Sequence, residues 1–209
     1  MARRAPVQQR SIDSMNRMLD AGEELFYAGG SHALTLEAVI ERAETSTGSF
    51  YARFGDMRGF LDAMHERVLA TVAAEILPVL AKAAMEPNLD SSMNKAFTGV
   101  FAVVERHRIP LYFFAVGNSH DEEWRAMGAQ LALGMSDTFT ELMMSYLPKF
   151  TGTASKRRID MAARMSIASV FQQIMLDQEE FSRMKMSRKS IATEYAGMVC
   201  AYLRATPMK

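Results

Sequence analysis

The sequence predicts an all-α fold, in which a small helical domain is followed by a larger helical bundle. Apolar residues recur every three or four positions along each long segment, which is the spacing of one face of a helix. No run of residues alternates between apolar and polar side chains as a half-buried strand does. The six prolines and 12 glycines fall mostly between the periodic segments. We therefore expect about nine helices, the first three compact and the others longer.

The first predicted helix covers Ser11–Ala28. Its apolar residues form a single stripe, made by Met15, Met18, Leu19, Leu25 and Phe26. Gly29 and Gly30 follow directly. Glycine commonly ends a helix, because it adopts the left-handed backbone conformation without steric strain.

Two short helices follow, joined by a tight turn. Thr35 is expected to cap the first, "LEAVIERA", and Thr45 or Ser46 to cap the second, Thr47–Phe54. Gly55 ends the second short helix. A helix, a short helix, a turn and another short helix within about 45 residues form the helix-turn-helix pattern, whose second helix enters the major groove of DNA.

The last of these helices, Thr47–Phe54, has two different faces. Phe50 and Phe54 lie four residues apart and are expected to point into the core of the small domain. The small residues Thr47, Gly48 and Ser49 open the helix, where short side chains let the helix backbone approach phosphates and base edges. Tyr51 and Arg53 also fall outside the buried stripe. Periodicity alone allows a second interpretation, a short packed helix of an ordinary bundle.

The helices after Met57 are longer. We expect one to run toward Pro78, which ends or kinks it, and one to begin at Asp90 or Ser91 and reach about Arg106. Pro110 interrupts the chain before a short apolar segment. A long helix opened by Ser119 or Asp121 and reaching Tyr146, then helices over 156–178 and 187–205, complete the expected fold.

Composition excludes several classes of protein. The 24 basic and 24 acidic residues leave no net charge that would draw the whole chain to DNA or to a membrane. A single cysteine, Cys200, allows no disulfide within the chain, which fits a reducing cytoplasm. No apolar run reaches the ~18 residues of a membrane span, and no apolar core follows the charged N-terminus as in a secretion signal. We expect a cytoplasmic protein.

Two stretches resemble the TetR (tetracycline repressor-like) family of transcriptional regulators: "MLDAGEELFYAGG" and "TLEAVIERAETSTGSFYARFGDMRGFL". The residues in register with the family pattern are Leu25, Phe26, Gly30, Thr35, Val39, Ala43, Ser46, Ser49, Tyr51, Phe54 and Leu61. The resemblance covers the first ~65 residues; the remainder matches only in length and helical layout. It implies a DNA-binding helix-turn-helix domain over 1–56 and an effector-binding and dimerisation domain over 57–209.

Carried over position by position, the resemblance implies a DNA-contacting set made of Thr35, Leu36, Thr47, Gly48, Ser49, Tyr51, Arg53 and Arg58. Met57 occupies the position of the family's phosphate-contacting lysine, so either Arg58 next to it substitutes or the contact is lost. Glu44 stands where the family usually has the glycine of the turn, so the turn either tolerates a side chain or takes a slightly different path. Gly22 stands where the family has alanine. Double-stranded operator DNA is the implied partner, and repression is the family's usual mode.

Charge gives this interpretation weak support. Residues 1–60 carry seven arginines against eight acidic residues, so the small domain is not basic. Arg3, Arg4 and Arg10 form an acid-poor arm that could follow phosphates or a minor groove. The alternative is a disordered tail.

The family's larger domain binds a small effector, which changes the spacing of the two DNA-reading heads. The candidate pocket residues here are Phe97, Phe101, Tyr112, Phe113, Phe114, Trp124, Met127, Phe139 and Met143. Such a wall suits an apolar or aromatic ligand. For each of these residues, plain core packing is the alternative.

The last two helices are expected to form a homodimer. They carry small residues that let helices approach closely: Ala162, Ala163, Ser166, Ala168, Ser169, Ala192, Ala196 and Gly197. Such faces also occur inside helical bundles, so packing within one chain is the alternative. A protein that reads DNA with one short helix also usually needs two copies.

No pattern of an enzyme is present. The sequence has no glycine-rich phosphate loop, no paired Cys and His nucleophile and no serine elbow. His107 and His120 lie near acidic residues but lack the spacing of a helical metal site, so we expect neither a metal nor a cofactor. The remaining alternative is a helical ligand- or protein-binding dimer whose head no longer binds DNA specifically.

Overall fold

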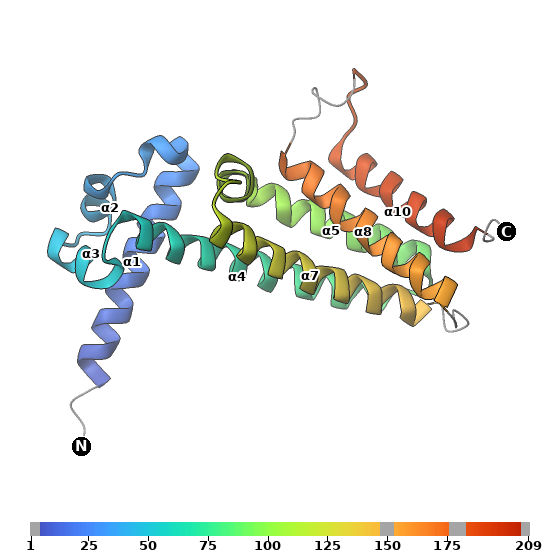
Figure 1. The fold of residues 1–209 in the computed structure, drawn as a ribbon, viewed down its shortest axis with the longest axis horizontal. Helices are drawn as coiled ribbons and strands as arrows, with labels where there is room; N and C mark the ends of the chain where they lie inside the picture. Colours follow the sequence, from blue (N-terminus) through green and yellow to red (C-terminus); the bar gives the residue numbers. More distant parts are fainter. Residues whose placement is uncertain (1–4, 147–152, 176–182, 206–209) are drawn as a thin grey trace. The chain divides into compact units, whose positions relative to one another are not determined.

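The computed structural model describes residues 5–146, 153–175 and 183–205 of the 209-residue chain, and side chains within 11–146, 156–172 and 183–205. Its regular structure in these ranges consists of nine α-helices and two short helical turns, with no strand (Figure 1). The predicted all-α fold is therefore confirmed. Arg3 and Arg4 of the proposed N-terminal arm, and the side chain of Arg10, lie outside the described part.

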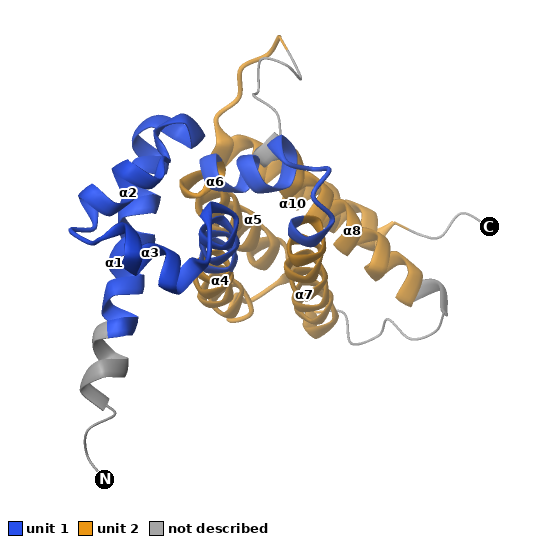
Figure 2. Cartoon of the chain, turned by 60° about the vertical axis from the view of Figure 1, so that its left-hand side comes forward, with its two compact units in different colours: residues 1–69, 109–124 blue, residues 70–108, 125–209 orange. Residues whose placement is uncertain are grey.

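The elements, in chain order, are α1 (Ala5–Gly29), η1 (Gly30–Ala33), α2 (Leu36–Arg42), α3 (Thr47–Phe54), α4 (Met57–Ala83), α5 (Leu89–Arg106), α6 (Arg108–Tyr112), η2 (Phe113–Gly117), α7 (Glu122–Tyr146), α8 (Thr153–Met175) and α10 (Arg188–Arg204). The chain divides into two compact units (Figure 2). Unit 1 contains residues 1–69 and 109–124, and unit 2 contains 70–108 and 125–209. These units describe packing, so the functional domains 1–56 and 57–209 remain a prediction.

Unit 1 is built around the aromatic residues of α1, α3 and α4. Phe26, Phe50 and Phe60 are almost completely buried. The ring centroids of Phe50, Phe54 and Phe60 lie 5.0–5.2 Å from one another, which is a favourable distance for aromatic pairs. The inward direction predicted for Phe50 and Phe54 is thus observed, and this cluster fixes α3 on the unit.

Local capping sets the ends of the short helices. The Thr35 hydroxyl accepts a hydrogen bond from the amide of Ala38 at 3.2 Å and so begins α2. The Ser46 hydroxyl accepts one from the amide of Ser49 at 3.2 Å and begins α3. Gly55 ends α3 with a φ of 76°, a value that favours glycine. Of the two caps offered by the sequence for α3, Ser46 is the one used.

Two predictions about the longer helices need correction, and one of two outcomes is excluded for a third. Pro78 does not end α4, which continues to Ala83 with its buried face extending past the proline to Leu80 and Ala83. Helix α5 is capped by Asn88 rather than by Asp90 or Ser91, because the side-chain carbonyl oxygen of Asn88 accepts from the Ser91 amide at 3.0 Å. Pro110 lies inside the first turn of α6, where a missing N–H is tolerated.

Unit 2 is organised around α5, which packs against α8 and α10. The small residues of α8 and α10 close this packing within a single chain. Those that are almost completely buried are Ala162, Ala163, Ser166, Ser169, Ala192 and Ala196, whereas Ala168 and Gly197 are exposed. The six buried residues therefore serve packing inside the chain and no longer argue for a dimer face, whereas Ala168 and Gly197 stay accessible. Cys200 is also buried here, and burial raises the pKa of its thiol to about 11.

In the part of the chain that the structure describes, no helix is both long enough and apolar enough to span a membrane.

Candidate functional site

The first turn of α3 forms an uncovered surface on unit 1. Thr47 and Gly48 are exposed, and no atom beyond the helix itself and its neighbours lies within 4 Å of the position that a Cβ of Gly48 would take. Tyr51 follows one turn later, with 48% of its surface exposed. Its ring packs edge-on against Phe50 with the centroids 5.8 Å apart. Short residues and an exposed phenol on one helix start are chemically suited to phosphates and base edges.

Ser49 and Arg53 take part in the local structure of the same helix. The Ser46 hydroxyl donates to the Ser49 hydroxyl at 3.1 Å, within the cap. Arg53 donates from Nη1 to the Ser49 carbonyl at 2.8 Å and from Nε to the Ser11 carbonyl at 3.2 Å. These bonds join α3 to α1 and leave the Arg53 Nη2 group for a further acceptor.

Thr35 and Leu36 open α2. Thr35 is exposed, its hydroxyl is used in the cap, and Leu36 is half-buried. The first turn of α2 thus presents backbone amides at a helix N-terminus, which favours an anionic partner.

The turn between α2 and α3 contains the departure expected at Glu44. Its φ is 49°, which is the left-handed region, and Glu44 is the one non-glycine residue there with positive φ among those described. A side chain in this conformation costs roughly 1–2 kcal/mol. The turn therefore keeps the backbone path that suits glycine and accepts strain instead.

Close packing explains why a glycine stands at position 22, although glycine has a low helix propensity. A Cβ at this position would lie 2.6 Å from Cζ of Phe60 and 2.9 Å from Sδ of Met64. The glycine lets α1 and α4 approach closely inside unit 1, so alanine there would force the Phe60 ring to move.

Arg58 lies in a cluster of carboxylates rather than on an open surface. Its Nε donates to Asp62 at 2.7 Å, and its Nη groups pair with Asp121 and, at 3.3 Å, with Glu123. The guanidinium also stands 4.5 Å from the centre of the Trp124 ring. Trp124 completes the cluster, because its indole N–H donates to Asp62 at 2.6 Å.

This arrangement changes the role of two predicted site residues. The hydrogen bond from Arg58 is the main cause that lowers the pKa of Asp121, followed by the backbone amide of Trp124. Since the donors of Arg58 are occupied by carboxylates, the structure does not present it to DNA as the sequence pattern implied. Trp124, expected in a ligand pocket, joins α4 to the start of α7 within unit 1.

His65 is buried one turn after Asp62, with 2% of its surface exposed. Its ring stacks on Phe114 with the centroids 4.3 Å apart. Nδ1 has no hydrogen-bond partner among the described residues. Burial lowers the pKa of His65 to about 4, against a smaller opposite effect of Asp62 and Asp121.

The residues predicted to line an effector pocket are divided between the two compact units. Phe97, Phe101, Phe139 and Met143 are buried in the core of unit 2, each with at most 4% of its surface exposed. Met127 belongs to the same unit, whereas Tyr112, Phe113, Phe114 and Trp124 belong to unit 1. Tyr112 is 43% exposed. Core packing, the alternative offered by the sequence, describes the four buried residues.

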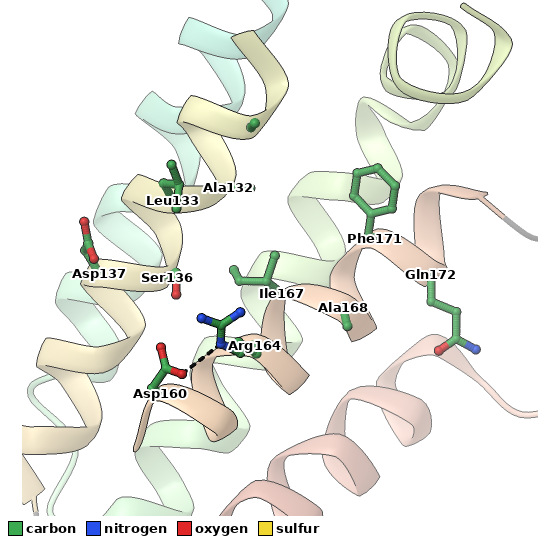
Figure 3. Close-up of a pocket in the computed structure, with 11 residues that line it drawn as sticks. Ala132, Leu133, Ser136, Asp137, Asp160, Arg164, Ile167, Ala168, Phe171 and Gln172 are labelled. Atoms are coloured by element: carbon green, nitrogen blue, oxygen red, sulfur yellow. Dashed lines mark hydrogen bonds and ion pairs between the residues drawn. The ribbon is translucent and has the colours of Figure 1, made fainter. Parts of the chain in front are cut away.

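A groove in unit 2 lies between α7 and α8 (Figure 3). It has a volume of about 870 Å³ and is lined by Ala129, Ala132, Leu133, Ser136, Asp137, Asp160, Arg164, Ile167, Ala168, Phe171 and Gln172. Ile167 and Phe171 project from α8 into the opening, and Arg164 pairs with Asp160 at 2.8 Å. No residue of the predicted pocket wall is among those that line this groove. The exposed apolar side chains of Leu133 and Phe171 mark it, a signal that only the structure reveals.

Within the described ranges, no three His, Cys, Asp or Glu side chains are placed to hold a metal ion.

Comparison with known proteins gives two results. The sequence pattern of the family described as "Bacterial regulatory proteins, tetR family" matches residues 18–64, which span most of α1, α2, α3 and the start of α4. No curated protein sequence matches the chain.

Solved structures of similar fold cover nearly the whole chain. A protein from Mesorhizobium loti, assigned to the TetR family of transcriptional regulators, is 13% identical, with 93% of this chain and 96% of that chain covered and a TM-score of 0.71. The TetR-family transcriptional regulator PfmR from Thermus thermophilus is 15% identical, with coverages of 92% and 100% and a TM-score of 0.60. A transcriptional regulator from Aquifex aeolicus is 17% identical, with coverages of 89% and 99% and a TM-score of 0.61.

All three of these structures are described as transcriptional regulators and none as an enzyme. Their low identity to this chain shows a shared fold, and the sequence pattern places residues 18–64 in the tetR family. The chain therefore contains a segment that belongs to the tetR family of bacterial regulatory proteins, within the fold of solved TetR-family transcriptional regulators.

Proposed function

We propose that this protein is a cytoplasmic, homodimeric repressor that binds an inverted-repeat operator through α3 and is released by a small apolar or aromatic effector. The observation that carries the proposal is the uncovered first turn of α3. There Thr47, Gly48 and Tyr51 are exposed on a helix that the aromatic core of unit 1 holds in place.

The α3 surface supplies both kinds of DNA contact. Backbone amides at the helix start favour phosphate oxygens, and the hydroxyls of Thr47 and Tyr51 can bond to phosphates or base edges. Ser49 and the Nη2 group of Arg53 add donors on the next turn. Thr35 and Leu36, at the start of α2, lie next to the DNA backbone in the proposed complex. Arg58 is left out of the proposed contacts, because it is engaged with Asp62, Asp121 and Glu123.

Two copies would read two half-sites. One short recognition helix contacts only a few base pairs, so specificity in helix-turn-helix proteins comes from two-fold symmetric dimers on inverted repeats. We assign the dimer interface to α8 and α10. In place of the buried small residues, the exposed Met161 of α8 and the exposed Gly197, Met198 and Ala201 of α10 support this assignment.

The effector would bind in the groove between α7 and α8. Its lining is mainly apolar, with Leu133, Ile167 and Phe171 as its largest apolar side chains, and a volume of about 870 Å³ suits a small organic molecule. Release follows if the effector binds more tightly to a state of the dimer in which the two heads no longer match the operator.

One observation favours a second candidate function, a helical ligand-binding dimer without specific DNA binding. Arg58, the basic residue next to the position of the family's phosphate-contacting lysine, is neutralised by carboxylates. Glu44 adds strain in the helix-turn-helix.

Selection of genomic fragments separates the two candidates. Purified protein is incubated with sheared DNA of its own organism at moderate salt, and the bound fragments are sequenced. The proposal predicts a few enriched sites that share an inverted repeat. A folded, dimeric protein that enriches no site above random fragments would establish the second candidate instead.

A further inference from the structure

Unit 2 contains a second groove, formed by α4, α5 and α10. Its volume is about 640 Å³. The residues that line it are Val79, Lys82, Glu86, Ser91, Asn94, Lys95, Thr98, Gly99 and Lys189. Most of them come from α5, which forms the floor, while α4 and α10 form the sides. None of them lines the groove between α7 and α8.

The charge around this groove is positive, although the whole chain has no net charge. Lys82, Lys95 and Lys189 stand against a single carboxylate, Glu86. Glu86 pairs with Lys95 at 2.5 Å, which leaves Lys82 and Lys189 uncompensated among the lining residues. Lys189 also lies in the first turn of α10, where the helix dipole favours an anion. Ammonium groups around a concave surface concentrate anions there.

The floor of the groove offers one polar group that the protein itself does not satisfy. The Thr98 hydroxyl is buried and has no hydrogen-bond partner among the described residues. The neighbouring polar groups are engaged, since Ser91 bonds to Asn88 and Asn94 donates to Thr193. An unpaired buried hydroxyl is destabilising unless something else supplies a partner.

The rest of the floor is apolar and close-packed. A Cβ on Gly99 would lie 2.4 Å from Cγ1 of Val79, so α4 and α5 touch at this point. The aliphatic stems of the lysines extend the apolar surface toward the rim. A ligand that fits this groove therefore needs an apolar body and more than one negative charge.

We propose that the groove between α4, α5 and α10 binds a small organic dianion, a phosphate monoester or a dicarboxylate with an apolar body. The anionic group lies between the ammonium groups of Lys82 and Lys189, and the apolar body covers Val79 and Gly99. The Thr98 hydroxyl, buried in the unliganded groove, turns toward the ligand and donates to it. This site is separate from the groove proposed for the apolar effector, so the protein has room for two small molecules of different chemistry.

Fluorescence titration of the full chain with 1-naphthyl phosphate tests the proposal, with 1-naphthol as the neutral probe of the same body. We expect saturable binding of the phosphate that depends on Lys82 and Lys189. Binding of the naphthol, whose apolar aromatic body also suits the groove between α7 and α8, should not depend on these two lysines. The double variant Lys82→Gln/Lys189→Gln should weaken phosphate binding by more than about tenfold. The control Lys156→Gln removes an exposed charge on α8 outside the lining and should leave the affinity unchanged.

A Thr98→Val variant distinguishes binding in this groove from non-specific attraction of an anion to surface lysines. Removing an unsatisfied buried hydroxyl should raise the denaturant midpoint of the free protein while it weakens binding of 1-naphthyl phosphate several-fold. Absence of saturable binding, or equal losses in the Lys156→Gln and Lys82→Gln/Lys189→Gln proteins, would overturn the proposal.

Discussion

At the scale of single residues, Glu44 shows how the chain keeps a family turn without the family glycine. Its backbone takes the left-handed conformation, with φ at 49°, and the amide of Glu44 still bonds to the Glu41 carbonyl at 3.2 Å. The sequence identifies Glu44 as a departure and leaves open whether the turn changes its path or tolerates the side chain. The structure shows the second outcome, because packing of α2 and α3 on α1 fixes the turn.

Replacing Glu44 with glycine should stabilise the protein. Relief of the left-handed strain exceeds the extra flexibility that glycine gives the unfolded chain, so the free energy of unfolding should rise by about 0.5–1 kcal/mol. Urea denaturation measures the change. The matched control Glu41→Gly, inside α2, should lower the same quantity by about 1 kcal/mol. A loss of stability in Glu44→Gly would contradict the strain.

His65 should make stability depend on pH. Its pKa is about 4 in the folded protein, against 6.5 for a histidine free of such burial. Between these values the unfolded chain binds a proton that the folded chain does not, so stability is fully present above pH 6.5 and falls as the pH drops toward 4. The loss attributable to this residue is on the order of 3 kcal/mol.

Urea denaturation of His65→Phe between pH 4 and 7 checks this effect, since phenylalanine can stack on Phe114 without a titrating group. The variant should lose much less stability toward acid than the wild-type protein. His32→Gln changes an exposed histidine and should keep the wild-type profile. If the free energy of unfolding fell in parallel for His65→Phe and the wild type as the pH dropped, His65 would not be the cause of the loss in acid.

At the scale of elements, α3 combines a buried anchor with a bare recognition surface. The variant Gly48→Ala changes the recognition surface without disturbing the buried anchor, because an added Cβ would have no neighbouring atom of the protein within 4 Å beyond the helix itself. The change should raise the free energy of unfolding by about 0.5 kcal/mol through helix propensity, yet lower affinity for an enriched fragment because the methyl group enters the interface. Gly128→Ala on α7 also meets no atom within 4 Å and should affect stability alone. Unchanged DNA affinity in Gly48→Ala would place the interface elsewhere.

The Arg58 cluster ties α4 to the start of α7 through side chains more than 55 positions apart in the chain. Arg58→Gln should lower thermal stability, because Asp62 and Asp121 lose their main cationic partner. It should leave the salt dependence of DNA affinity unchanged, since the cluster holds Arg58 away from phosphates. A slope of log affinity against log salt that falls by about one would show instead that Arg58 contacts a phosphate.

These elements show which features the sequence could predict. Caps such as Thr35 and Ser46, and the inward direction of Phe50, depend on residues within one or two turns, and helical periodicity captures them. The Arg58 cluster and the groove between α7 and α8 depend on contacts between segments that lie far apart in the chain. Periodicity and short motifs in a single sequence do not reveal such contacts. The small residues of α8 and α10 mislead for a related reason, because a pattern that permits close helix packing does not say whether the partner helix belongs to the same chain.

At the scale of the whole molecule, the fold is retained at 13–17% identity to solved structures of TetR-family proteins. Such identity is compatible with one fold because the periodic apolar pattern, rather than particular residues, determines how helices pack. Functional sites, in contrast, depend on particular side chains rather than on the apolar pattern. The family pattern matches residues 18–64, which contain the proposed recognition helix, whereas the rest of the chain is similar to the solved structures in fold alone.

The measurement that tests the central claim most directly is fluorescence anisotropy of an enriched genomic fragment with wild-type protein and with Thr47→Ala/Tyr51→Ala. Thr47 is exposed and Tyr51 is 48% exposed, so the double variant should remain folded, with only a small loss of thermal stability from the contact between Tyr51 and Phe50. Tyr112→Phe, an exposed tyrosine of α6, is the control. If α3 reads the operator, the double variant should bind the fragment at least about 100-fold more weakly, while Tyr112→Phe binds as the wild type does. Equal affinities of the wild type and a folded double variant would contradict the claim that this protein recognises DNA through α3.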